Sequence, residues 1–353
     1  MERAEPAAES RRERDLSLIW RSTLTHLVPV REPLVLISQI QRSGGTLLSQ
    51  LFDRHPQVHA HPHELKIGHP KESTWPRLDL DASPATWFET LEERPARQAF
   101  KRGYKKQSKA LLREIASGEV ESFPFLLPPS LQWRIFEHCV ETTRISRSRD
   151  ILDAYMTSYF NAWLDNHNLR GRQKRIVTGF TPRLVTRRAS VADFFAAYPD
   201  GKLLTIVRRP ESWFVSARKH KPHVYGDIER AVELWLRSAQ AAVAAKERYG
   251  DRVFIVSFEE LIQDTRAVMG ELATYLGIDF DQTLLEPTFN GFRIKADSSF
   301  RVSGYGIVAD PLDRHSSISA EESSFIERRT REAHELSLSL KGLGYRTVAA
   351  AAL

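Results

Sequence analysis

The sequence predicts an α/β protein built as three layers, with a central parallel sheet flanked by helices on both faces. Short apolar runs alternate with stretches of helical periodicity along most of the chain, an order typical of strand–helix–strand units. The apolar runs are continuous rather than alternating, as in strands that are buried on both faces. A turn with two glycines joins the first run to the first helix, where ligands of such sheets bind.

The first strand is expected over residues 34–38, an apolar run that follows Pro33. The first helix is expected to begin at Gly45, because Leu47, Leu48, Leu51 and Phe52 fall on one helix face. It should end near His55, because Pro56 disfavours helix in the residue before it.

The alternation of strand and helix patterns resumes after residue 175. Further strands are expected over 175–180, 203–209 and 253–258. Helices are expected over 210–220, 227–249 and 264–276, and the second and third are followed by Gly250 and Gly277 as stop signals. A last helix should begin at Ser319, because Glu322 three positions later completes a capping box.

The chain is expected to form one domain over 31–345, preceded by a charged tail over 1–30. Its 353 residues, 41% of them hydrophobic, are enough to bury a large core. Residues 65–175 carry the least regular pattern and are expected to form a mostly helical insertion beside the sheet.

Composition excludes several classes of protein. The single cysteine, Cys139, excludes a disulfide framework, and no pair of cysteines suggests a zinc site. No stretch approaches the roughly 20 apolar residues of a membrane span, and no secretory signal is visible, so we expect a cytoplasmic protein. The net charge of +6 suits an anionic ligand, but no motif indicates a nucleic-acid partner.

The turn Arg42-Ser43-Gly44-Gly45-Thr46 has the composition of an anion site. Backbone N–H groups at a glycine-rich turn and helix N-terminus favour negative charge, and the hydroxyls and the arginine fork add donors. The turn is similar to a P-loop, but it lacks the lysine and the outer glycine of a nucleoside-triphosphate loop. A kinase or ATPase is therefore disfavoured.

The turn and the following residues 52–58 resemble the 5′-phosphosulfate loop of the sulfotransferases that use 3′-phosphoadenosine 5′-phosphosulfate (PAPS). The similarity is greatest to the bacterial and tyrosylprotein branch, in which an arginine replaces the lysine of the cytosolic branch. A second stretch resembles the 3′-phosphate motif of the same family. Arg208 ends a predicted strand and Ser216 follows eight residues later in a predicted helix, so both can reach one phosphate.

The resemblance covers about residues 34–64 and 176–302. Phe258 stands where the family often has a tyrosine near the adenine, and the loop that carries Lys295 and Ser298 resembles a loop that closes over the nucleotide. Arg209 and Phe180 depart from the usual residues. The implied donor site comprises Arg42, Ser43, Gly44, Gly45, Thr46, Leu47, Arg208, Ser216, Phe258, Ser299 and Arg301.

The resemblance implies transfer of a sulfuryl group from PAPS to a hydroxyl or an amine, with Arg42 among the catalytic residues and no metal. The family places the general base just after the first helix, where Glu64 is favoured and His63 is the second candidate. The "HAHPHE" stretch also resembles a metal-binding run. Pro62 and the lack of a further ligand set argue against a metal there.

Other functions stay open at this point. An atypical P-loop nucleotide kinase and a non-catalytic protein that binds nucleotides or polyanions are the alternatives. The acceptor, whether a carbohydrate, a lipid or a small metabolite, is not readable from the sequence. The oligomeric state is open as well, with a homodimer as one alternative.

Overall fold

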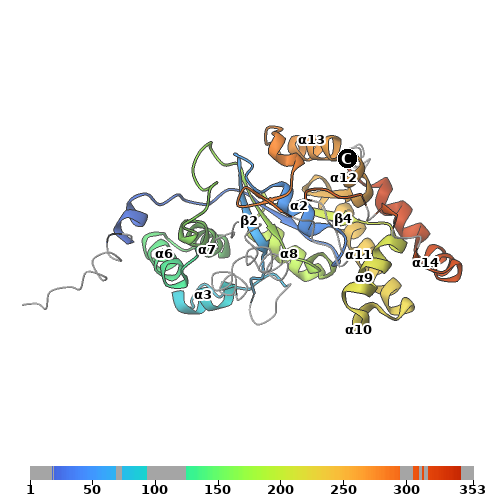
Figure 1. Ribbon diagram of the computed structural model, residues 1–353. Helices are drawn as coiled ribbons and strands as arrows, with labels where there is room; N and C mark the ends of the chain where they lie inside the picture. Colours follow the sequence, from blue (N-terminus) through green and yellow to red (C-terminus); the bar gives the residue numbers. More distant parts are fainter. Residues whose placement is uncertain are drawn as a thin grey trace, which may run out of the picture.

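The protein is built around one sheet of five parallel strands in the order β2-β3-β1-β4-β5 (Figure 1). The computed structural model describes residues 18, 20–68, 74–93, 125–294, 305–309, 312–313 and 317–342. The strands are β1 (Leu34–Ile37), β2 (Val58–Glu64), β3 (Ile176–Phe180), β4 (Lys202–Val207) and β5 (Val253–Ser257). A short antiparallel pair, β6 (Thr288–Phe289) and β7 (Phe292–Arg293), lies outside this sheet.

Helices follow most of the strands, as the alternation of the sequence predicts. Those before β4 are α2 (Gly45–Leu51), α3 (Pro84–Leu91), α6 (Pro129–Thr142), α7 (Ser148–Ala162) and α8 (Arg188–Ala197). Those after β4 are α9 (Pro210–His220), α10 (Pro222–Tyr225), α11 (Ile228–Tyr249), α12 (Phe258–Gln263), α13 (Thr265–Leu276) and α14 (Ala320–Ser339). Single turns of 3-10 helix occur at Leu184–Thr186, Gly250–Arg252 and Gln282–Leu285.

Both faces of the sheet are covered, which explains the continuous apolar runs. One face packs against α2, α12 and α13 through a cluster that includes Val35, Ile37 and Leu204. The other face packs against α3, α6, α7 and α8, with Leu34, Leu36 and Leu203 among the buried residues. Figure 1 shows α3, α6 and α7 at one end of the molecule and α9, α10, α11 and α14 at the other.

The predicted strands and helices are confirmed, with small shifts at their ends. The first helix ends at Leu51 instead of near His55. Phe258 begins α12 instead of ending β5. The expected capping box of Ser319 and Glu322 is present at the start of α14. The described part of 65–175 holds three helices, α3, α6 and α7.

Within the described residues, no helix is both long enough and apolar enough to cross a membrane.

Candidate active site

The turn between β1 and α2 has the backbone shape that an anion site needs. Arg42 and Gly44 both have positive φ, 71° and 102°. Gly44 is the residue before the first turn of α2 and provides no side chain to cap it. The N–H groups of that first turn therefore point to a place where a bound anion can satisfy them.

Close packing requires a glycine at both positions 44 and 45. A Cβ atom on Gly44 would lie 2.4 Å from the ring of Phe258. A Cβ atom on Gly45 would lie 1.9 Å from Nε2 of Gln39 and 2.5 Å from the ring of Phe180. The side chains of Gln39, Phe180 and Phe258 thus hold the backbone of the glycine turn in place.

The two sequence motifs, more than 160 residues apart, meet at this turn. Nη1 of Arg208 donates a hydrogen bond to the carbonyl oxygen of Arg42 over 2.9 Å. Nε of Arg42 donates to Oγ of Ser216 over 3.4 Å. Arg208 and Ser216 are 3% and 0% exposed. Two guanidinium groups and one hydroxyl are therefore gathered beside the glycine turn, a set suited to binding phosphate or sulfate oxygens.

Two tryptophans hold this arrangement in place. The indole N–H of Trp213, on α9, donates to the carbonyl oxygen of Gln41 over 2.8 Å. The indole N–H of Trp235, on α11, donates to the carbonyl oxygen of Arg208 over 3.0 Å. Both rings are buried, so these bonds form away from water.

A model of the sulfotransferase family matches residues 33–282 of the chain. The chain belongs to the sulfotransferase family.

Two solved structures share the fold of this sulfotransferase over nearly their whole length. The sulfotransferase domain from the curacin biosynthetic pathway is 16% identical with a TM-score of 0.50, covering 85% of this chain and 98% of that chain. The sulfotransferase domain from the Synechococcus PCC 7002 olefin synthase is 18% identical with a TM-score of 0.50, covering 88% and 96%. No curated protein matches the chain.

Phe258 packs against Arg208 and Gly44, which belong to the two predicted donor motifs. Its ring is 4.4 Å from the guanidinium carbon of Arg208 and touches Gly44, and the residue is 4% exposed. This position orients Arg208 by a cation–π contact. Stacking of Phe258 on an adenine stays a prediction. At Arg209 the backbone N–H donates a hydrogen bond to Oε1 of Glu259, a contact that does not depend on the side chain at this position.

Strand β2 separates the two candidate bases onto opposite faces of the sheet. Glu64 pairs in register with Phe180, on the face that packs against α2, and its Oε2 lies 3.2 Å from Nζ of Lys66. His63 lies on the opposite face, where its Nε2 is 2.9 Å from the hydroxyl oxygen of Tyr159 on α7. Burial, with the neighbouring His61, lowers the pKa of the His63 imidazole to about 4.

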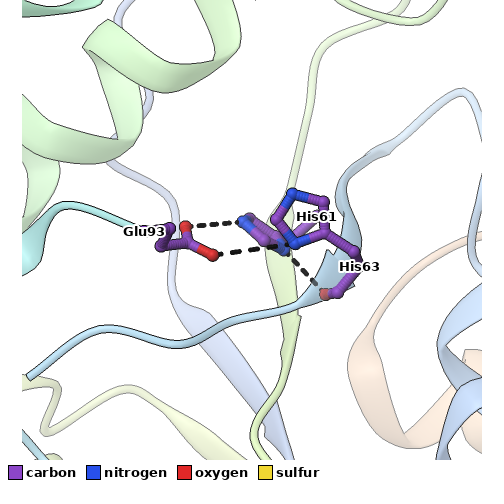
Figure 2. A group of neighbouring side chains, drawn as sticks. All are labelled: His61, His63 and Glu93. Atoms are coloured by element: carbon purple, nitrogen blue, oxygen red, sulfur yellow. Dashed lines mark hydrogen bonds and ion pairs between the residues drawn. The ribbon is translucent and has the colours of Figure 1, made fainter. Parts of the chain in front are cut away.

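His63 belongs to a buried cluster with His61 and Glu93 (Figure 2). Nε2 of His61 is 2.9 Å from Oε1 of Glu93, and Nδ1 of His63 is 3.7 Å from Oε2. Burial raises the pKa of Glu93, but its contacts with His61, His63 and the N–H of Lys66 together outweigh burial and lower that pKa overall. No sequence motif indicates Glu93, which follows α3.

Gln39 is a second residue that the motifs did not indicate. It follows β1, is 1% exposed, and its Nε2 is the atom that excludes a side chain at position 45. Neither polar atom of its amide has a hydrogen-bond partner in the described part of the chain. A buried amide in this state is suited to bind a ligand oxygen at the turn.

The remaining predicted donor residues divide into two groups. Ser43 is buried in the turn, and Thr46 and Leu47 are half-buried at the start of α2. Ser299 and Arg301, with Lys295 and Ser298, lie outside the described residues.

Proposed function

We propose that this sulfotransferase transfers a sulfuryl group from PAPS to a hydroxyl group of an acceptor. The observation that carries the proposal is the convergence of Arg42, Arg208 and Ser216 at the glycine turn. A nucleotide with a phosphosulfate and a separate phosphate has two anionic groups for these donors. The sulfotransferase family supports the donor class, and the acceptor is unidentified.

In this assignment Arg208 and Ser216 bind the 3′-phosphate, and Arg42 with the first-turn N–H groups of α2 binds the phosphosulfate. Gln39 would donate its amide N–H to a sulfuryl oxygen. Sulfuryl transfer resembles phosphoryl transfer, in which charge spreads over the equatorial oxygens and catalysis consists mainly of positioning and electrostatic stabilisation. The chain's own cations therefore supply most of the catalysis.

Glu64 is assigned as the general base, because it faces the α2 side of the sheet. Its carboxylate takes the proton of the acceptor hydroxyl while the acceptor oxygen forms a bond to sulfur. The bond between sulfur and the bridging phosphate oxygen breaks. Adenosine 3′,5′-bisphosphate leaves with the electron pair, and the acceptor leaves as its sulfate ester.

Calorimetric titration with adenosine 3′,5′-bisphosphate tests the donor site. Arg208→Ala removes charge-assisted hydrogen bonds and should weaken binding by about tenfold to a hundredfold. The matched control is Arg209→Ala, which removes an equal charge from the exposed neighbouring residue and should bind within about threefold of wild type.

Arg208→Lys keeps the positive charge but loses the planar guanidinium, so its affinity for adenosine 3′,5′-bisphosphate should lie between those of wild type and Arg208→Ala. Melting curves establish that each variant is folded. Equal affinity of Arg208→Ala and wild type would overturn the 3′-phosphate assignment. Stabilisation by ATP with Mg²⁺ but not by adenosine bisphosphate would overturn the choice of donor.

A further inference from the structure

The segment that follows β3 lies at the carboxyl edge of the sheet, between the two halves of the proposed site. The strand order places β3 between β2, which carries Glu64, and β1, which leads into the glycine turn. On one side, the N–H of Leu65 donates to the carbonyl oxygen of Phe180 over 2.7 Å. On the other side, the N–H of Arg183 donates to the carbonyl oxygen of Gln39 over 2.8 Å. The end of β3 and the residues after it therefore lie between the base and the turn.

An acceptor bound for transfer has to occupy this stretch of the edge. In the proposed function, its hydroxyl must reach the carboxylate of Glu64 on one side and the sulfuryl group at the glycine turn on the other. The donor nucleotide extends the other way, toward Arg208 after β4 and Ser216 on α9. The edge in front of β3 is thus left for the acceptor.

Arg183 places a positive charge at this stretch of the edge. It is exposed, and among the described residues no carboxylate forms an ion pair with it. Burial raises the pKa of the Tyr225 hydroxyl, and the charge of Arg183 acts against that rise, which places the guanidinium near Tyr225. The same hydroxyl donates to Oε1 of Gln41 over 3.2 Å, and Gln41 directly precedes the glycine turn. The charge of Arg183 is therefore available to a ligand beside the turn.

The backbone of Arg183 is held in a conformation that disfavours arginine. Its φ is 67°, in the left-handed region, which costs roughly 1 to 2 kcal/mol for a residue with a Cβ atom. Glycine adopts the same conformation without this cost. Strained residues of this kind cluster at ligand sites, so the conformation of Arg183 favours a role for its side chain in binding.

Two chain segments add to the positive charge around Arg183. Residues 182–192, which include Arg183, contain three arginines and no acidic residue. Residues 212–226, which include Tyr225, contain three cations and no acidic residue, and one of these cations, Arg218, is paired with Glu322. An excess of one sign of charge raises the local concentration of ligands of the opposite sign. This stretch of the edge therefore favours an anionic acceptor over a neutral one.

We propose that Arg183 binds an anionic group of the acceptor, so that the acceptor carries a carboxylate or a phosphate besides the hydroxyl that receives the sulfuryl group. The guanidinium fork can form paired hydrogen bonds with either anion. This contact holds the acceptor hydroxyl between Glu64 and the glycine turn. The inference rests on the proposed function and names its acceptor class, and Arg183 is not among the residues assigned to the donor.

Modification of arginines by phenylglyoxal, followed residue by residue by mass spectrometry, tests the proposal on the wild-type protein. Saturation with adenosine 3′,5′-bisphosphate should shield Arg42 and leave Arg183 reactive. Titration of this complex with glucuronate, which tests a carboxylate, or with glycerol 3-phosphate, which tests a phosphate, should slow labelling of Arg183 by about tenfold at ten times the Kd. Glucose and glycerol, the matched neutral compounds, should leave it unchanged. Arg188, exposed at the start of α8, is the internal control, and its labelling should stay constant throughout.

Arg183→Gly removes the charge and should remain folded, because glycine adopts a φ of 67° without strain. Melting curves check this. Calorimetric titration of its complex with adenosine 3′,5′-bisphosphate should show the protecting anion binding about tenfold to a hundredfold more weakly than in wild type. The matched control, Arg188→Gln, should bind that anion within about threefold of wild type. Both variants should bind the nucleotide as wild type does.

Each outcome of the labelling experiment decides a different question. Shielding of Arg183 by the nucleotide alone would overturn the proposal and assign this arginine to the donor. Shielding of Arg42 without protection of Arg183 by either anion would overturn it and leave the proposed function intact, and so would equal protection by the neutral compounds. Failure of the nucleotide to shield Arg42 would overturn the proposed function itself, and the acceptor class with it.

Discussion

Glu64 and His63 are adjacent in the sequence, but side chains of neighbouring strand residues point to opposite faces of a sheet. Val58 and Ala60 of β2 pack with α2, and Glu64 returns to that face after a shift in register between Ala60 and Glu64. Ala60 and Glu64 are an even number of residues apart, so their side chains point to the same face of the sheet. Glu64 therefore shares its face with the helix that begins at the glycine turn.

Glu64→Gln should lower turnover by at least about a hundredfold, because an amide cannot take the acceptor's proton. The measurement is the release of adenosine 3′,5′-bisphosphate from PAPS with a panel of hydroxyl acceptors. Binding of adenosine 3′,5′-bisphosphate should stay within about threefold of wild type, because Glu64 is not among the residues assigned to the donor. Near-normal turnover of Glu64→Gln, with a large loss in His63→Gln, would transfer the role of the base to His63.

The sequence predicted those site residues that lie close together within a single strand–turn–helix segment. Arg208 and Ser216 are eight residues apart within β4 and α9, and the structure brings both to Arg42. Glu93 was not predictable, because nothing local links it to His61, which is 32 residues earlier. Its contact depends on how α3 packs against α6 and α7, which is a property of the tertiary structure.

At the scale of elements, β2 is the strand of the five-stranded sheet that the sequence did not predict. Its segment, Val58–Glu64, contains three histidines and Pro62 and few β-branched residues. Position in the sheet explains why it is nevertheless a strand. It lies at the sheet edge, pairs with β3 alone, and an edge strand tolerates a proline. Pairing with β3 and packing against α2 outweigh the weak local preference.

The start of α2 should be intolerant of any side chain at position 44. Gly44→Ala places a Cβ atom 2.4 Å from Phe258 on a residue with φ of 102°. The backbone strain alone costs about 1 to 3 kcal/mol, and the overlap adds to it. We expect a loss of unfolding free energy above about 3 kcal/mol in urea denaturation, with loss of nucleotide binding.

Gly277→Ala is the matched control. Gly277 ends α13 with φ of 72°, and no atom lies within 4 Å of a Cβ placed there. Gly277→Ala strains the backbone but places its Cβ atom against no other atom, so it should lower the unfolding free energy by only about 1 kcal/mol. Equal destabilisation by the two variants would show that Phe258 does not hold the turn.

At the scale of the whole molecule, the clusters on the two faces of the sheet are joined through the strands. Leu34 belongs to the cluster that packs with α6 and α7, and its neighbour Val35 belongs to the cluster that packs with α2. Any opening that separates the strands therefore exposes both clusters. The glycine turn, which follows β1, would be lost in the same event.

Cys139 is the only cysteine and reports on such an opening. It lies on α6, is 8% exposed, and burial raises the pKa of its thiol to about 11. At pH 8 its thiolate fraction is roughly 200-fold lower than in an unfolded chain, where the pKa is about 8.5. Iodoacetamide should therefore label the native protein very slowly, and labelling should proceed through the opened state.

Adding adenosine 3′,5′-bisphosphate then measures how far the opening extends. If Cys139 becomes accessible only when the strands separate, a ligand at 100 times its Kd should slow labelling by about a hundredfold. The measurement is pulse labelling followed by mass spectrometry of the intact chain in moderate urea. A labelling rate that the nucleotide leaves unchanged would mean that α6 opens on its own, away from the glycine turn. We expect the slower rate, because α6 packs on α7 and both belong to a cluster that includes strand residues of β1, β3 and β4.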